Sequence, residues 1–275
     1  MKTYCYFAFC LTLLAPLSWS SPAELGDYQL VWQDEFNCQN RLSNADWDYE
    51  QGFVRNHELQ WYQQDNAYCD DGLLIIEGRR ESKLNPKYQA NSENWRNSRA
   101  HIDYTSASVT TKGKHSWLYG RFEVRAKIRA EDGLWPAIWF LGNTGNWPSK
   151  GEIDLMEYYQ GQILANAAWG DNKAIWDTVK VPLTSFKNKG WDQDFHLWRM
   201  DWNKNSIKLF VDGELINTID LTKAVNPAGV VPRHPFQQPH YLILNLAIGG
   251  EQGGSPAQSY FPSRYEIDYV RIYQK

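Results

Sequence analysis

Hydrophobic and polar positions alternate along much of this chain with a period of two residues. In residues 121–128 the apolar side chains are Phe122, Val124, Ala126 and Ile128, and the positions between them are all Arg, Glu or Lys. Successive side chains of a β-strand point to opposite faces of a sheet. The pattern therefore predicts a half-buried antiparallel strand, with one face in the core and the other toward solvent.

Short β-rich runs separated by turn residues recur from residue 28 onward. They cover residues 30–32, 73–76, 104–111, 198–202, 241–248 and 265–273. Residues 207–211 and 215–219 flank Asp212 and Gly213, a pair that favours the tight turn of a β-hairpin. Helical signals are confined to short turns, so the chain is predicted to be all-β, as a sandwich of two sheets.

Residues 151–159 combine a β-prone apolar run with three carboxylates, Glu152, Asp154 and Glu157. Strict alternation would place Glu157 on the face opposite the other two. One extra residue at Leu155–Met156, a β-bulge, would bring all three carboxylates to one face and keep the apolar residues in the core. A helix is disfavoured, because positions five apart lie about 140° apart around its axis.

Three acidic side chains on one strand face suit a particular chemistry. Like charges in close proximity raise one pKa, so that one carboxyl stays protonated beside an ionised neighbour. A retaining glycosidase needs such a pair, about 5–5.5 Å apart, as general acid and nucleophile. The alternative is an acidic strand face in solvent without catalytic role.

This segment resembles the catalytic strand of glycoside hydrolase family 16, in the bulged Glu-x-Asp-x-x-Glu form of laminarinase-like enzymes. Four other segments resemble that family in the same order, namely residues 119–125, 135–139, 245–250 and 268–273. The resemblance implies a β-jelly-roll sandwich of two curved antiparallel sheets with an open substrate cleft. It also implies that Glu152 is the nucleophile, Glu157 the acid/base and Asp154 an assisting group between them.

The resemblance extends to substrate contacts. Trp135 and Trp139 resemble the aromatic wall of the family's cleft, and core packing is the alternative role for both. Asn56 and Trp61 lie in a stretch that resembles the glycone side of the cleft, where Glu58 is either a contact or a structural residue.

Trp169 is expected on the strand after the catalytic one and is assigned to substrate binding. Many laminarinases have a His where this chain has Ala168, and an Arg where it has Ser108. These two departures predict a cleft that has lost two hydrogen-bonding groups and gained room beside Trp169. They bear on glucan specificity and leave the reaction class unchanged.

The N-terminus reads as a secretory signal peptide spanning residues 1–20. Lys2 precedes an apolar run over residues 4–17, and small residues lead to a cleavage position near Ser20. A retained membrane anchor is the alternative, but the run is shorter than the roughly 20 residues that span a bilayer. We therefore expect a secreted product, extracellular or periplasmic, with one catalytic domain over residues 21–275.

Export bears on the cysteines. Cys38 and Cys69 are the only cysteines after the signal peptide, and a disulfide between them is predicted, with two free thiols as the alternative. Related enzymes often hold a structural calcium ion, for which Asp268 is the side-chain candidate. Catalysis itself is expected to need no cofactor.

The charge of the chain argues against a nucleic-acid partner. The whole sequence has 28 basic and 32 acidic residues, for a net charge of −4. Removal of Lys2 with the signal peptide leaves 27 basic residues and a net charge of −5. Such a balance does not favour a phosphate backbone. We expect a monomer without a membrane span, whose partner is a polysaccharide or glycan substrate.

Three functions remain open from the sequence. The first is a retaining endo-β-glycosidase that cleaves β-1,3- or mixed β-1,3/1,4-glucan. The second is the same chemistry on β-galactosyl linkages, as an endo-β-galactosidase of galactans or of poly-lactosamine and mucin O-glycans. The third is a non-catalytic lectin on the same jelly roll. The three carboxylates argue against the lectin, because a binding protein does not need a coupled acid pair.

Overall fold

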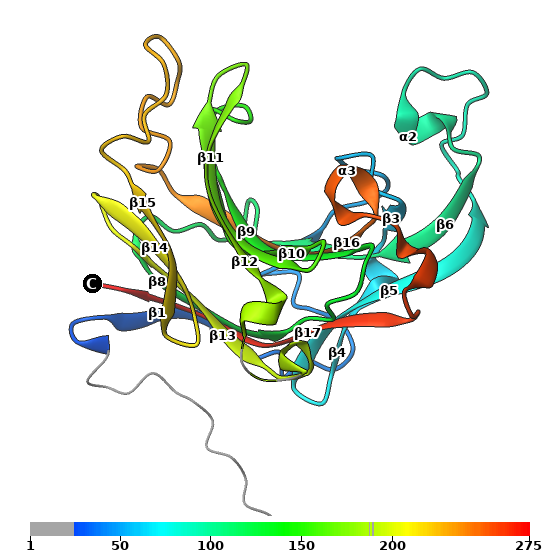
Figure 1. The fold of residues 1–275 in the computed structure, drawn as a ribbon, viewed down its shortest axis with the longest axis horizontal. Coiled ribbons are helices and arrows are strands. Elements are labelled where there is room, and N and C mark those ends of the chain that lie inside the picture. Colours follow the sequence, from blue (N-terminus) through cyan, green and yellow to red (C-terminus); the bar gives the residue numbers. More distant parts are fainter. Residues whose placement is uncertain (1–24, 187, 189) are drawn as a thin grey trace, which may run out of the picture.

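The computed structural model describes residues 25–186, 188 and 190–275. The predicted signal peptide, residues 1–20, lies outside the described residues. The chain forms two stacked sheets, of ten and seven strands, as the alternation predicts. In Figure 1 the seven-stranded sheet lies over the ten-stranded one, curving up at β11 on one side, while β6 and α2 rise on the other. No helix within the described ranges is long and apolar enough to cross a membrane.

The ten-stranded sheet forms the convex layer. Its main path runs, in spatial order, through β15 (Glu214–Asp220), β14 (Ser206–Val211), β13 (His196–Trp202), β8 (Gly120–Lys127), β17 (Ser263–Gln274), β5 (Leu73–Leu84), β6 (His101–Ser106) and β3 (Gln60–Tyr62). Two further strands join it, β1 (Gln29–Asp34) on β17 and β4 (Ala67–Asp70) on β5. The β3–β6 pair is parallel, in contrast to the purely antiparallel sheets that were predicted.

The seven-stranded sheet forms the concave layer. Its strands are, in spatial order, β12 (Ala174–Pro182), β11 (Gln162–Gly170), β10 (Glu152–Tyr159), β9 (Leu134–Gly142), β16 (His240–Ile248), β7 (Ser108–Thr110) and β2 (Asp48–Tyr49). Helical segments are short, namely α2 (Trp95–Ser98), α3 (Gly250–Gly253), η1 (Gln64–Asn66), η2 (Leu183–Ser185), η3 (Trp191–Gln193) and η4 (Pro256–Gln258).

The hydrophobic core lies between the two sheets. The predicted apolar face of β8 is buried, and Phe122 packs edge-on against Phe140 of β9, with ring centroids 5.2 Å apart. The opposite face of β8 is less exposed than predicted. Its Arg125 forms an ion pair with Asp268, and Lys127 pairs with a carboxylate of β17 2.7 Å away. Cross-strand ion pairs thus cover a face that the sequence pattern assigned to solvent.

One predicted strand proves to be two. Residues 104–111 read as a single β-rich run, but the chain passes from the convex sheet to the concave sheet at Ala107. This change of sheet places Ser108 beside the residues of the cleft.

The predicted disulfide is present between Cys38 and Cys69, whose Cα atoms are 5.6 Å apart. It ties the segment after β1 to β4.

Candidate active site

The three acidic side chains come from β10, and the predicted bulge brings them together. Opposite β11, Glu152 pairs with Ala168 and Asp154 with Asn166, and the register then shifts before Glu157. The pairing with β9 shifts at the same place. The extra residue returns Glu157 to the face of the other two acids, and all three line one cleft of about 700 Å³.

Glu157 is held by two donors. Trp135 Nε1 donates to Oε1 at 2.8 Å, and Asn166 Nδ2 donates to Oε2 at 2.9 Å. Burial raises the pKa of Glu157 to about 7, opposed by the Trp135 hydrogen bond and assisted by the negative charge of Glu152. A carboxyl that loses its proton near neutral pH can serve as acid in one step and as base in the next.

The surroundings of Glu152 favour its ionised form more strongly than those of Glu157 do. Burial raises its pKa, but three neighbours oppose this effect: the indole of Trp147, the positive charge of Arg55 and a hydrogen bond with Asp154. Trp147 Nε1 donates to Oε2 at 2.7 Å. An ionised carboxylate at this position is suited to act as nucleophile.

Asp154 lies between the two glutamates and is 2% exposed. Its pKa is raised well above the usual value, first by burial and then by the charges of Glu157 and Glu152. The raised pKa favours the protonated form of Asp154, which can donate a hydrogen bond to Glu152. This arrangement helps to keep the pKa values of the two glutamates apart, as an acid and a nucleophile require.

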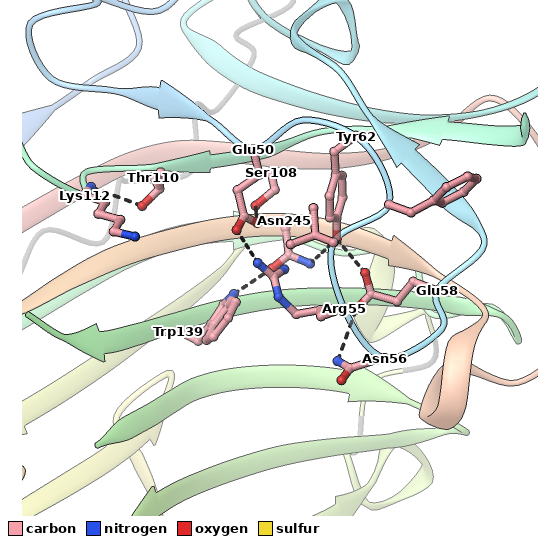
Figure 2. A network of polar contacts seen from close by, with 12 residues as sticks. Glu50, Arg55, Asn56, Glu58, Tyr62, Ser108, Thr110, Lys112, Trp139 and Asn245 are labelled. Atoms are coloured by element: carbon pink, nitrogen blue, oxygen red, sulfur yellow. Dashed lines mark hydrogen bonds and ion pairs between the residues drawn. The ribbon is translucent and has the colours of Figure 1, made fainter. Parts of the chain in front are cut away.

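A second polar network forms the wall of the cleft beside these acids (Figure 2). Arg55, from the loop between β2 and β3, pairs with Glu50, whose other carboxylate oxygen accepts a 2.6 Å hydrogen bond from Ser108. The guanidinium carbon of Arg55 lies 5.0 Å from the ring centroid of Trp139. Trp139 Nε1 donates to Asn245 at 2.7 Å. The wall thus presents a cation stacked on an indole.

This network gives Ser108 a structural role. Its buried hydroxyl donates to Glu50, the carboxylate that pairs with Arg55. The cleft has a guanidinium of its own, supplied by Arg55 from another segment.

Asn56 lines the cleft, as predicted, and donates from Nδ2 to Glu58 at 3.2 Å. Glu58 is 2% exposed and also accepts hydrogen bonds from Gln60 at 2.6 Å and Tyr62 at 3.3 Å. Its negative charge contributes to the raised pKa of Glu157. Glu58 therefore has two roles: its hydrogen bonds hold this loop together, and its charge acts on the pKa of Glu157.

Comparison with known proteins places these observations in a family. The model of glycosyl hydrolases family 16 matches residues 79–271. The chain belongs to glycoside hydrolase family 16. Three of the segments that resemble this family, residues 135–139, 151–159 and 245–250, contribute side chains to the cleft. The other two, residues 119–125 and 268–273, lie in or next to β8 and β17 of the convex sheet, and the jelly-roll architecture agrees with the prediction.

Relatives of this glycoside hydrolase act on different glycans. The β-glucanase of Rhodothermus marinus is 34% identical, over 90% of this chain and 85% of that protein. The keratan-sulfate endo-1,4-β-galactosidase of Sphingobacterium multivorum is 29% identical, over 90% of this chain and 56% of that protein. A structure solved in work on endo-acting O-glycanases of the human gut microbiota that initiate mucin breakdown has a TM-score of 0.82 and 35% identity, covering 90% of this chain and 91% of that one.

Two predicted contacts of this family 16 site lie elsewhere. Trp169 follows Ala168 on β11. Because side chains alternate along a strand and Asn166 faces the cleft, Trp169 faces the core. Its ring centroid lies 6.1 Å from that of Phe236. Trp61 packs edge-on against Phe53, 5.4 Å between ring centroids. Neither ring is among the residues that line the cleft, which corrects both predictions. Trp135 and Trp139 do line it.

Trp147 and Trp176 are among the aromatic residues of the cleft that sequence reasoning missed. Trp147 precedes β10 in a loop, is 54% exposed and contacts Glu152 directly. Trp176 of β12 lies opposite Ala168, is 48% exposed and lines the cleft. The alternation of β12 could have placed Trp176 on the cleft face once its register with β11 was known. No sequence pattern marks Trp147, because its position depends on the shape of a loop.

The calcium role of Asp268 stays a prediction. Its carboxylate already pairs with the guanidinium of Arg125. In the part of the chain that the structure describes, no group of three or more His, Cys, Asp or Glu side chains could hold a metal ion.

Proposed function

We propose that this family 16 hydrolase is a retaining endo-β-glycosidase that cleaves β-galactosyl linkages within poly-lactosamine or mucin-type glycans. The observation that carries the choice of substrate is the covered face of Trp139. With Arg55 stacked on one side of the indole and its edge bonded to Asn245, Trp139 offers less apolar surface to a sugar ring. The similarity in fold and sequence to the mucin O-glycanase structure supports the same choice.

The proposed reaction proceeds in two steps. In the first, the Glu152 carboxylate attacks the anomeric carbon, the glycosidic bond breaks, and Glu157 gives its proton to the leaving oxygen. In the second, Glu157 takes a proton from water, which attacks the glycosyl-enzyme and releases Glu152. Asp154 donates a hydrogen bond to Glu152 when the nucleophile is charged, and thereby orients it. The pKa of about 7 for Glu157 suits both halves of this cycle.

Arg55 gives this cleft a donor with fixed geometry. Its guanidinium is bound on one side by Glu50, so it is oriented before substrate arrives. A donor of this kind favours sugars that present a strong acceptor, such as the carbonyl oxygen of an N-acetyl group, over the weaker hydroxyl acceptors of a plain glucosyl unit.

A β-1,3-glucan is the second candidate substrate. It is favoured by the identity to the R. marinus β-glucanase and by the exposed rings of Trp147 and Trp176, which are suited to contact the apolar faces of sugar rings.

Export after cleavage near Ser20 and a monomeric state stay predictions and form part of this proposal.

The test compares initial rates on poly-lactosamine, desialylated mucin O-glycans, laminarin and mixed-linkage glucan under one condition, with analysis of product length. The proposal expects internal cleavage of a galactosyl glycan at a kcat/KM at least as high as that for laminarin. Laminarin cleavage far faster than cleavage of both galactosyl substrates would overturn it in favour of the glucan. Arg55→Met should shift the ratio toward laminarin, because it frees the face of Trp139.

A further inference from the structure

Beyond Glu152, the concave sheet continues into a region where two lysines converge on one tyrosine. Leu141 of β9 pairs with Glu152 on one side and with Tyr241 of β16 on the other. Tyr241 is therefore two strands from the nucleophile, about 10 Å away at the usual strand spacing. Leu141 also lines the cleft, so this region adjoins the cleft.

The two lysines approach the ring of Tyr241 from different segments. Lys112 follows β7 and has its Nζ 5.8 Å from the ring centroid, while Lys150 ends the loop before β10 and has its Nζ 5.7 Å from the same centroid. Lys112 lies on the Thr110 side of the Arg55–Glu50 pair, away from Glu58, in Figure 2. Within residues 25–186, 188 and 190–275, neither ammonium group lies in an ion pair.

Each ammonium is attracted by the ring, but the arrangement also brings two positive charges close together. Two like charges directed at one ring repel each other, and burial together with the charge of Lys112 lowers the pKa of Lys150. The negative charges that raise the pKa of Tyr241 are those of Glu50 and Glu152. Glu50 is paired with Arg55, and Glu152 is bonded by Trp147. The ammonium groups are therefore available to an anion from the substrate.

We propose that Lys112 and Lys150, on the platform of Tyr241, form a subsite for an anionic substituent of the glycan, either a sulfate ester or a sialic-acid carboxylate. Both anions accept charge-assisted hydrogen bonds from ammonium groups. The aromatic ring between the lysines would support the sugar that carries the anion. This inference rests on the endo-β-glycosidase function and narrows its substrate to glycans with acidic decoration.

The experiment measures kcat/KM on matched pairs of oligosaccharides that differ only in the anion. One pair is sulfated and desulfated poly-lactosamine, and a second is sialylated and neutral poly-lactosamine. The proteins are the native enzyme, the double variant Lys112→Met/Lys150→Met, and the control Lys114→Met. Lys114 lies in the same loop as Lys112, but its ammonium donates to the backbone carbonyl of Asn44.

We expect the native enzyme to have a higher kcat/KM on the anionic member of at least one pair. In the double variant this ratio of anionic to neutral kcat/KM should fall by about tenfold, which is the effect expected when charge-assisted hydrogen bonds are removed. The preference should also weaken as salt is raised. The rate on neutral chains should stay unchanged, which shows that the variant is folded, and Lys114→Met should behave as native. A loss confined to one pair identifies which anion the subsite binds.

An unchanged preference in the double variant, or no preference in the native enzyme, would overturn the subsite. To distinguish a failure of the subsite from a wrong choice of glycan backbone, the same variants are tested on sulfated and unsulfated laminari-oligosaccharides. If only the glucan backbone is cleaved, the galactosyl proposal fails, while the effect of the lysines is still measured on the sulfated glucan.

Discussion

Replacement of Trp135 by Phe should move the alkaline limb of the activity profile to higher pH. The indole N–H of Trp135 donates to Glu157 Oε1 at 2.8 Å and stabilises the ionised carboxylate. Phe keeps most of the ring and removes this donor. A hydrogen bond to a charged group contributes roughly 1.5–3 kcal/mol, and one pKa unit corresponds to about 1.4 kcal/mol. The pKa of Glu157 should therefore rise by roughly one to two units.

The sign follows from the role of Glu157 as acid. Its pKa of about 7 sets the pH above which the proton, and with it activity, is lost. If Trp135→Phe raises this pKa, the enzyme keeps its proton to about pH 8 or 9. The assay is kcat/KM against pH, which reports the groups of the free enzyme. Trp139→Phe is the matched control, because Trp139 Nε1 donates to the neutral amide of Asn245. A limb that stays in place in Trp135→Phe, or shifts equally in both variants, would refute this reasoning.

Four further predictions concern the acids, their neighbour and the disulfide. Glu152→Gln should abolish turnover while oligosaccharide binding stays measurable by calorimetry, and Glu157→Gln should spare aryl glycosides with good leaving groups; full activity of either variant on the polymer would contradict the assignment. Early-time NMR of the reaction should show the β-anomer first, and an initial α-product would exclude Glu152 as nucleophile. Arg55→Lys keeps a charge and should leave the acidic limb near its native position, whereas Arg55→Met should move it to higher pH, because the guanidinium lowers the pKa of Glu152; equal limbs in the two variants would argue against that electrostatic role. Ser at both Cys38 and Cys69 should lower the free energy of unfolding by about 3–4 kcal/mol in urea titrations, for a loop of 31 residues, and an unchanged midpoint would contradict the disulfide.

Local patterns predicted the elements that depend on short-range rules. The spacing of Glu152, Asp154 and Glu157 on an apolar strand was sufficient to place a bulge, because only an extra residue reconciles the acids with the core. The turn at Asp212 likewise predicted the hairpin of β14 and β15. These features follow from periodicity and turn preference, which a sequence displays directly.

Features that depend on register between distant strands were not predictable in this way. The face that Trp169 occupies is set by how β11 pairs with the bulged β10, and a shift of one residue reverses it. The split at Ala107 depends on which sheet receives each half of the run. The position of Arg55 over Trp139 joins a loop to a strand more than eighty residues later. Such contacts become visible only when the sheets are assembled.

The separation of Arg55 from β10 has a consequence for how such enzymes diversify. The three carboxylates belong to β10, an interior strand of the concave sheet, whereas the cation on the wall of the cleft belongs to a loop between β2 and β3. Exchange of that loop, with Ser108 as its partner, would alter the choice of glycan without moving either glutamate. Natural variation and laboratory evolution can therefore change the substrate through the 50–56 loop while the carboxylates of β10 stay in place, provided that a positive charge is kept near Glu152.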